Sequence, residues 1–209
     1  MIKYINLKAN ASETTLRVTF FERLKINLYS ILSHANFLPI QNKLKHIKSS
    51  DECVIIGNGP SLNKVDWKKV SSFDTFGVNS IFLLKEKMNF IPKFYVVEDV
   101  YVAEDRKDEI NIENRGRVEI FPNYLKYLFK DKPNAFFINV FFYYGRFFKP
   151  RIGRSIDHGL FVGGSVSHLC IQIAIHLGYS KIHLIGFDHN YVINPTVETE
   201  GKKLVSTKN

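Results

Sequence analysis

The chain has 209 residues, 45% of them hydrophobic, and a net charge of +9. This is ample material for one globular domain, alone or with an appendage. No apolar run reaches the roughly 18 residues that cross a bilayer, and the N-terminus MIKYINLKANASETT lacks the apolar region of a signal peptide. We therefore expect neither a membrane span nor a secretory leader.

Residues 1–50 hold most of the positive charge, with eight Lys or Arg against two Glu. Within them, TLRVTFFERLKINLYSILSHANFLPI mixes apolar and basic residues at roughly helical spacing. Two interpretations stay open: peripheral association of residues 14–48 with an anionic membrane surface, or a helix packed on the domain with a solvated basic face. No RNP, helix-turn-helix or zinc pattern accompanies the charge, so nucleic acid is not an expected partner.

From residue 51 onward, apolar runs alternate with helical stretches. A helix is predicted over 164–177, because apolar residues recur at helical spacing from Val166 to Leu177 and Gly178 follows as a C-cap. Alternation of this kind predicts an α/β fold: a doubly wound, Rossmann-like, mainly parallel sheet, preceded by the basic helical segment. The predicted strands are 53–56, 74–78, 94–97, 117–121, 135–141 and 181–186.

The two cysteines lie in these apolar stretches. Cys53 opens the first strand and Cys170 falls inside the helix at 164–177. Both are predicted to be small core residues rather than a disulfide, and two scattered thiols do not make a metal site. We expect a cytoplasmic protein, with peripheral attachment at the inner face of the membrane as the alternative.

Polar residues follow several predicted strands. Asn79-Ser80 follows the second strand, Glu98-Asp99 the third, and Asp188-His189-Asn190-Tyr191 the last. Ligands of parallel α/β sheets bind beyond the C-terminal ends of the strands. We therefore predict a ligand site at this edge of the sheet.

The first strand runs into the loop Gly57-Asn58-Gly59-Pro60-Ser61. The two glycines permit positive φ and let the backbone approach a ligand closely. Pro60 suits the first turn of a helix, whose free N–H groups attract anions, and Ser61 adds a hydroxyl. The loop is thus predicted to bind a phosphate or a nucleotide.

Two common nucleotide motifs do not fit this loop. A P-loop would need G-K-[ST], and no Lys stands at the required place. The dinucleotide motif G-x-G-x-x-G also fails, because Leu62 occupies the position of the third glycine, and Asn79 replaces the acidic residue that grips an NAD ribose.

GNGPSL, Asn79, PKFYVVED and GGSVSHLCIQIAIHLGYSKIHLIGFDHNY together resemble the 6-hydroxymethylpterin diphosphokinase MptE-like family. The loop, Asn79 and the small-hydroxyl turn before A-x-x-LGY also resemble bacterial family-42 sialyltransferases. The resemblance covers roughly residues 51–193. It divides the chain into a basic segment (1–50), a nucleotide-binding α/β domain (51–193) and a tail (194–209), whose lack of a final helix suggests truncation.

The sialyltransferase resemblance implies contacts to a nucleotide. By position, these are Asn58, Gly59, Pro60, Ser61 and Asn79, with Gly164 and Ser165 near the phosphate or the sugar. The chain departs from that family where Glu98-Asp99 replaces an Asn, which is closer to the diphosphokinase pattern. The catalytic His of the sialyltransferases lies beyond the end of this sequence.

Three further groups are candidates from the residues themselves. Asp99 could bind a ribose hydroxyl or a metal, or it could cap a helix that begins near Tyr101, whereas Glu98 should point to the other side of the strand, away from the ligand. Asp188 and His189 end the last strand, and His189 could act as a general base or as a hydrogen-bonding loop residue. Basic residues just before the glycine turn could neutralise phosphate or simply be solvated; they are Arg146, Lys149, Arg151 and Arg154.

Three functions remain as hypotheses. The first is a glycosyltransferase of bacterial surface-glycan synthesis that uses a nucleotide-activated sugar, for example a CMP-linked one. The second is a diphosphokinase that moves pyrophosphate from ATP to 6-hydroxymethylpterin, helped by Mg²⁺. The third is a non-catalytic nucleotide-binding protein.

Overall fold

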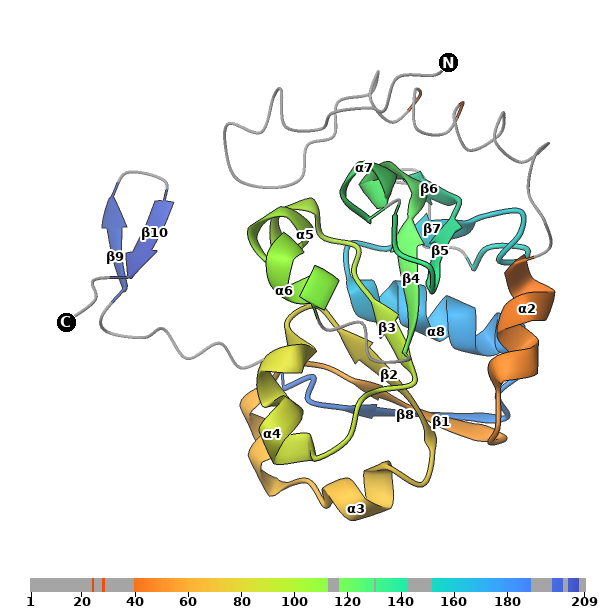
Figure 1. Cartoon of the computed structure of the whole chain (residues 1–209), viewed down its shortest axis with the longest axis horizontal. Helices are drawn as coiled ribbons and strands as arrows, with labels where there is room; N and C mark the ends of the chain where they lie inside the picture. The colour runs from red at the N-terminus through yellow and green to blue at the C-terminus, as the bar shows by residue number, and fades with distance from the viewer. Residues whose placement is uncertain are drawn as a thin grey trace.

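Six parallel strands form the central sheet of the computed structural model (Figure 1). Their order is β5-β4-β3-β2-β1-β8, and each neighbouring pair is parallel. The structure describes residues 24, 28, 40–112, 117–129, 131–142, 152–188, 197–200 and 203–206. The six strands are β1 (Glu52–Ile56), β2 (Asp74–Val78), β3 (Phe94–Val96), β4 (Val118–Pro122), β5 (Ala135–Ile138) and β8 (Lys181–Ile185).

Helices cover both faces of this sheet, as the alternating sequence predicts. The helices α2 (Ile40–Ile47) and α8 (Val166–Leu177) contribute to a buried apolar cluster on one face. The shorter helices contribute to a second cluster on the other face. They are η3 (Pro60–Lys64), α3 (Trp67–Val70), η4 (Ile81–Leu84), α4 (Lys85–Met88), α5 (Val100–Asp105), α6 (Lys107–Ile112), η5 (Asn123–Leu125) and α7 (Lys126–Phe129), where η denotes a 3₁₀ helix.

The predicted strand at 135–141 is wrong as a single element. It divides at Asn139 into β5 and β6 (Val140–Phe142), and β6 pairs in parallel with β7 (Leu160–Val162) in a separate sheet. The Asn139 side chain accepts a hydrogen bond from Asn123, and its carbonyl accepts one from the Leu160 N–H at 2.9 Å. These contacts direct the chain out of the main sheet. In the tail, β9 (Val197–Glu200) and β10 (Lys203–Ser206) pair antiparallel.

The predicted C-cap of α8, Gly178, is confirmed, and the structure adds an N-cap at the other end. Ser165 is the N-cap, and its hydroxyl accepts a hydrogen bond from the Ser167 N–H. Gly178 ends the helix with φ of 79°, a left-handed conformation that glycine adopts readily. The predicted helix at 164–177 therefore begins two residues later than expected.

The short helix α2, at the end of the basic segment, packs on the domain. Ile40 and Leu44 are buried in the cluster that α8 shares, whereas Lys43 and Lys45 are exposed. The remaining residues of the segment 14–48 that precede α2 lie outside the described part, apart from Leu24 and Leu28. Across the described residues, the structure contains no helix with the length and apolar character of a membrane span. Both cysteines are buried and free, as predicted.

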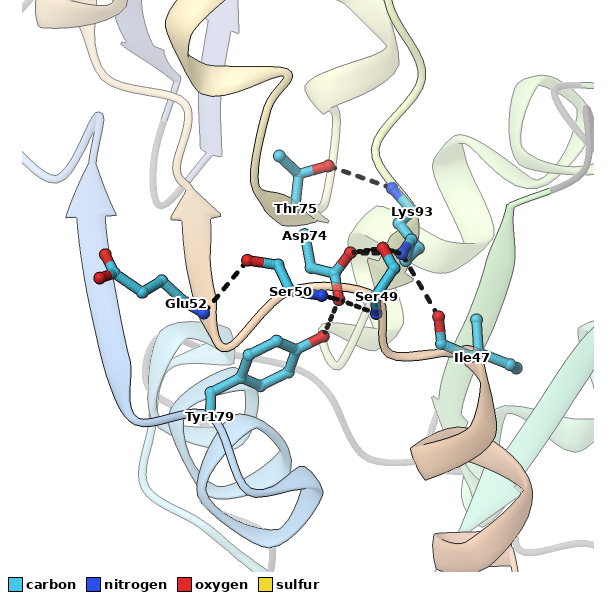
Figure 2. A network of polar contacts seen from close by, with 8 residues as sticks. All are labelled: Ile47, Ser49, Ser50, Glu52, Asp74, Thr75, Lys93 and Tyr179. Carbon is cyan, nitrogen blue, oxygen red and sulfur yellow. Dashed lines mark hydrogen bonds and ion pairs between the residues drawn. The ribbon is translucent and has the colours of Figure 1, made fainter.

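A buried carboxylate joins four segments at the N-terminal edge of the sheet (Figure 2). Asp74, at the start of β2, is 1% exposed. It accepts hydrogen bonds from the Ser49 N–H and hydroxyl at 2.8 and 2.7 Å and from the Tyr179 hydroxyl at 2.7 Å, and it pairs with Lys93. The network fixes the segment before β1, the segment before β3 and the α8–β8 turn, and so holds the sheet from the edge opposite the predicted ligand site.

Candidate functional site

The C-terminal edge of the sheet contains the point at which the strand order reverses. Successive strands from β1 to β5 are added on one side of β1, whereas β8 lies on its other side. In open α/β sheets, ligands bind outside the carboxyl ends of the strands at such a switch point. Here the loop at 57–61 follows β1 and residues 186–188 follow β8, so the predicted loop lies at the reversal.

The glycines of this loop are required for close contact with the end of β8. Neither Gly57 nor Gly59 adopts the positive φ that glycine permits, and Gly59 is extended with φ of −77°. Their N–H groups donate to the Ile185 and Gly186 carbonyls at 2.8 and 2.9 Å. A Cβ on Gly57 would lie 2.3 Å from the Gly186 oxygen, so glycine is needed for space and not for conformation.

Asp188 holds the other half of the loop. Its Oδ2 accepts a hydrogen bond from the Ser61 N–H at 2.7 Å, and a Cβ on Gly59 would lie 2.5 Å from the same oxygen. Pro60 begins a helix as predicted, but this helix is the five-residue 3₁₀ helix η3, and the Leu62 N–H donates back to Gly59. The expectation that the N–H groups of Ser61 and Leu62 are free for an anion is therefore wrong for this conformation.

Asn58 and Asn79 meet at the ends of β1 and β2. The Asn58 side-chain amide donates to the Val78 carbonyl at 3.2 Å. Asn79 has φ of 49°, a left-handed conformation that is uncommon for a residue other than glycine. Its Oδ1 is buried and accepts no hydrogen bond from any residue that the structure describes. Both asparagines thus lie at the C-terminal edge of the sheet.

The two acidic residues after β3 have different surroundings. Asp99 is the N-cap of α5, and its Oδ1 accepts from the Tyr101 and Val102 N–H groups at 2.8 and 3.3 Å. This is the capping alternative of the sequence analysis, and it leaves the exposed carboxylate at the C-terminal edge.

Glu98 is the functional candidate that the sequence analysis set aside. Strand alternation places it on the face of Phe94 and Val96, the face that α8 covers. Its Oε2 is buried and has no hydrogen-bond partner among the described residues. Burial, together with the nearby charge of Asp99, raises the pKa of Glu98 to about 7. In the sequence, Glu98 directly follows the apolar run FYVV, which is buried, and a carboxylate in that position was the signal that could have identified it.

Two further residues of this edge also carry buried polar atoms without partners. Asn123, directly after β4, is 3% exposed, and its amide donates to Asn139 while its Oδ1 accepts nothing from the described part of the chain. His168, in the first turn of α8, likewise has a buried and unpartnered Nε2, and its ring packs against the backbone of Gly163. Because α8 precedes β8 through a short turn at the N-terminal edge, its first turn lies at the C-terminal edge.

The unpartnered atoms therefore concentrate at one edge. In the described residues, five buried side-chain atoms lack a hydrogen bond, and four of them belong to Asn79, Glu98, Asn123 and His168. The fifth, Glu119 Oε2, forms an ion pair with Lys132 Nζ at 2.9 Å. Buried polar groups in proteins are nearly always paired, so a cluster of exceptions indicates a binding or catalytic site.

The remaining predicted residues are only partly within the described ranges. Gly164, with φ of 77°, and Ser165 are exposed in the turn before α8, at the same edge. Arg154 is exposed. Arg146, Lys149, Arg151 and His189 lie outside the described residues. Over the ranges that the structure describes, no three His, Cys, Asp or Glu side chains converge as metal ligands.

A protein-family model matches most of the chain. The sequence model described as 6-hydroxymethylpterin diphosphokinase MptE-like aligns with residues 22–194. No curated protein matches the chain.

Proposed function

The chain belongs to the 6-hydroxymethylpterin diphosphokinase MptE-like family, and from this premise we propose that it is a nucleotide-dependent transferase with a hydroxyl acceptor. The nucleotide binds at the ends of β1 and β2, beside Asn58 and Asn79. The acceptor binds beside Glu98, at the end of β3. The turn at Gly164 and Ser165 contacts the phosphate or the transferred group.

Glu98 is the observation that carries this proposal. A general base works best when its pKa lies close to the operating pH. The pKa of Glu98 is about 7 because the half-buried side chain holds its carboxylate away from water, beside Asp99. Its unpartnered Oε2 can accept a proton from an acceptor hydroxyl at neutral pH, which an ordinary solvated glutamate does poorly.

The first candidate reaction is pyrophosphoryl transfer, which the family description favours. Glu98 takes the proton of the acceptor hydroxyl, and the acceptor oxygen forms a bond to the β-phosphorus of a nucleoside triphosphate. The bond from that phosphorus to the oxygen bridging to the α-phosphorus breaks, and a nucleoside monophosphate leaves. Mg²⁺ would neutralise phosphate charge, and Asp99, the exposed carboxylate after β3, could hold it.

The second candidate is glycosyl transfer from a nucleotide sugar, such as a CMP-linked one. The observation that favours it is Asn79, whose buried Oδ1 is at the position that the sialyltransferase resemblance assigns to a nucleotide contact. The role of Glu98 is the same in both reactions, since an acceptor hydroxyl must lose its proton in each. The basic residues Arg146, Lys149, Arg151 and Arg154 would assist the departure of phosphate in either case.

Titration with CMP, CDP and ATP, each with and without Mg²⁺, tests the proposal. Mg²⁺-dependent ATP binding selects pyrophosphoryl transfer, to be followed by an assay for AMP release with 6-hydroxymethylpterin. Metal-independent CMP binding selects glycosyl transfer. If no nucleotide binds, the transferase proposal is wrong.

Substitution of Glu98, the proposed general base, tests its role in the reaction. Glu98→Gln should reduce turnover by roughly 10²–10⁴-fold while nucleotide affinity changes little. Glu86→Gln is the matched control, because Glu86 is an exposed glutamate of α4. Equal activity of the two variants would remove Glu98 from the reaction.

A further inference from the structure

Three hydrogen bonds fix the backbone around Asn79 in its left-handed conformation, two of them to residues of β3 and one from Asn58. Its N–H donates to the Val96 carbonyl of β3 at 3.2 Å. The carbonyl before it, Val78 O, accepts from the Asn58 amide at 3.2 Å. Its own carbonyl accepts from the Tyr95 hydroxyl. Strained backbone of this kind persists only where the surroundings fix it, and it concentrates at functional sites.

Tyr95 is itself fixed rigidly within the core. Its side chain is 0% exposed. The guanidinium carbon of Arg117 lies 3.9 Å from the centre of its ring, and the Phe121 ring meets it edge-on at 6.4 Å. Arg117 in turn donates two hydrogen bonds to Glu119, at 3.1 and 3.0 Å, and Glu119 pairs with Lys132. The ring therefore has one available position, which places its hydroxyl at the end of β2.

The hydroxyl acts as a donor at every physiological pH. Burial raises the pKa of Tyr95 above its ordinary value, so the proton that it donates to the Asn79 carbonyl is retained. The hydrogen bond from this hydroxyl thus connects the core of the domain to the backbone of Asn79.

We propose that Tyr95 is a positioning residue, whose hydroxyl holds Asn79 in the left-handed conformation that aims its side-chain oxygen at a hydrogen-bond donor of the nucleotide. This inference rests on the proposed nucleotide site. The donor on the ligand is an N–H or O–H group, such as an exocyclic amine of the base or a ribose hydroxyl, because Asn79 Oδ1 is an acceptor only. Tyr95 itself does not touch the ligand.

Two variants distinguish an effect of Tyr95 on the position of Asn79 from an effect on the stability of the protein. Tyr95→Phe removes only the hydroxyl and should weaken binding of CMP or ATP, whichever the protein binds, by about tenfold. Tyr179→Phe is the matched control, because it removes a buried tyrosine hydroxyl bond, to Asp74, at the opposite edge. It should lower the melting temperature but leave nucleotide affinity unchanged.

The combination with Asn79→Gly tests whether Tyr95 acts through Asn79. Glycine adopts positive φ without strain, so Asn79→Gly should keep or raise the melting temperature while it weakens nucleotide binding. If Tyr95 acts through Asn79, adding Tyr95→Phe to Asn79→Gly should weaken binding no further. A full additional tenfold loss in the double variant would overturn the proposal.

A measurement without ligand keeps the inference separate from the proposed function. The ¹³C chemical shifts of Asn79, read by NMR on the full chain, distinguish left-handed from extended backbone. In Tyr95→Phe they should move away from the left-handed values, and in Tyr179→Phe they should not. If the wild-type chain binds neither CMP nor ATP, the nucleotide proposal fails and these shifts alone decide whether Tyr95 positions Asn79. Unchanged shifts in Tyr95→Phe would overturn the role of Tyr95, whatever the wild-type chain binds.

Discussion

Glu98 makes the protein less stable at the pH at which it would be active. Its pKa of about 7 lies above the ordinary value of 4.5. Between these two values the folded chain keeps the proton that the unfolded chain has released, so the free energy of unfolding falls as pH rises. A carboxylate that is retained at a cost to stability is typical of a functional site.

Replacing this carboxylate should therefore stabilise the protein in alkaline solution. Glu98→Gln is expected to raise the free energy of unfolding at pH 8 by about 2–3 kcal/mol, with no gain at pH 4.5. Urea unfolding at both pH values measures the difference, with Glu86→Gln as the control. A gain that is equal at the two pH values would mean that burial of the charge is not the cause.

Gly59 and Gly178 are needed for different physical reasons, and alanine should distinguish them. At Gly59 a Cβ would meet the Asp188 carboxylate and the Gly186 carbonyl, at 2.5 and 2.8 Å. A Cβ on Gly178 would have no atom of the described residues within 4 Å, so only the positive φ opposes substitution there.

We expect Gly178→Ala to cost about 1 kcal/mol of stability without affecting binding. Gly59→Ala should cost about 1–3 kcal/mol and also weaken nucleotide binding, because the loop must move away from β8. Denaturation and nucleotide titration of both variants provide the comparison. Normal binding by a folded Gly59→Ala variant would show that the loop at 57–61 is not part of the site.

At the scale of elements, the Asp74 network holds together segments that are distant in sequence. Burial alone would raise the pKa of Asp74, but hydrogen bonds from Lys93, Ser49 and Tyr179 outweigh it and lower the value to about 2. The ordinary value is 3.8. The network therefore contributes stability at every pH above 3.8, and this contribution is lost as pH falls toward 2.

Loss of the Asp74 carboxylate should lower the stability of the protein by an amount that depends on pH. Asp74→Ala removes the ion-pair partner of Lys93 and should lower the free energy of unfolding by about 2–4 kcal/mol at pH 7. The deficit relative to wild type should shrink by about 2 kcal/mol as pH falls from 4 to 2. Chemical denaturation across this pH range measures it. A deficit that does not change with pH would show that the charge of Asp74 is unimportant.

At the scale of the whole molecule, the two edges of the sheet have different roles. The N-terminal edge contains the fully bonded Asp74 network. The C-terminal edge contains one buried side-chain atom each of Asn79, Glu98, Asn123 and His168 that has no hydrogen-bond partner among the described residues. Stability and ligand binding should therefore vary independently when one edge is altered.

Nucleotide should stabilise the wild type and Asp74→Ala by the same increment. A ligand at 100 times its Kd adds about 2.7 kcal/mol to the folded state, which corresponds to roughly 5–10 °C in Tm for a chain of this size. Thermal denaturation with CMP and with ATP measures the shift in each protein. A much smaller shift in Asp74→Ala would show that the two edges are coupled.

The sequence by itself determined the features that depend on neighbouring residues. The buried runs of β1 and β2, the helix α8 and its C-cap at Gly178 follow from apolar periodicity and from local backbone preferences, which can be read over a few residues. The alternation of strands and helices then made a parallel sheet with a polar C-terminal edge predictable. The sequence also predicted, as one alternative, that Asp99 caps the helix that follows it.

The tertiary structure alone decided which distant groups meet. The glycines of the loop at 57–61 looked like conformational glycines, and only the placement of β8 beside β1 shows that they are required for space. The pKa of Glu98 depends on burial under α8, more than sixty residues away in the chain, and the conformation of Asn79 depends on the hydroxyl of Tyr95. Desolvation and steric exclusion arise from atoms that sequence spacing does not bring together, so the chemistry of this site could be located from the sequence but not assigned from it.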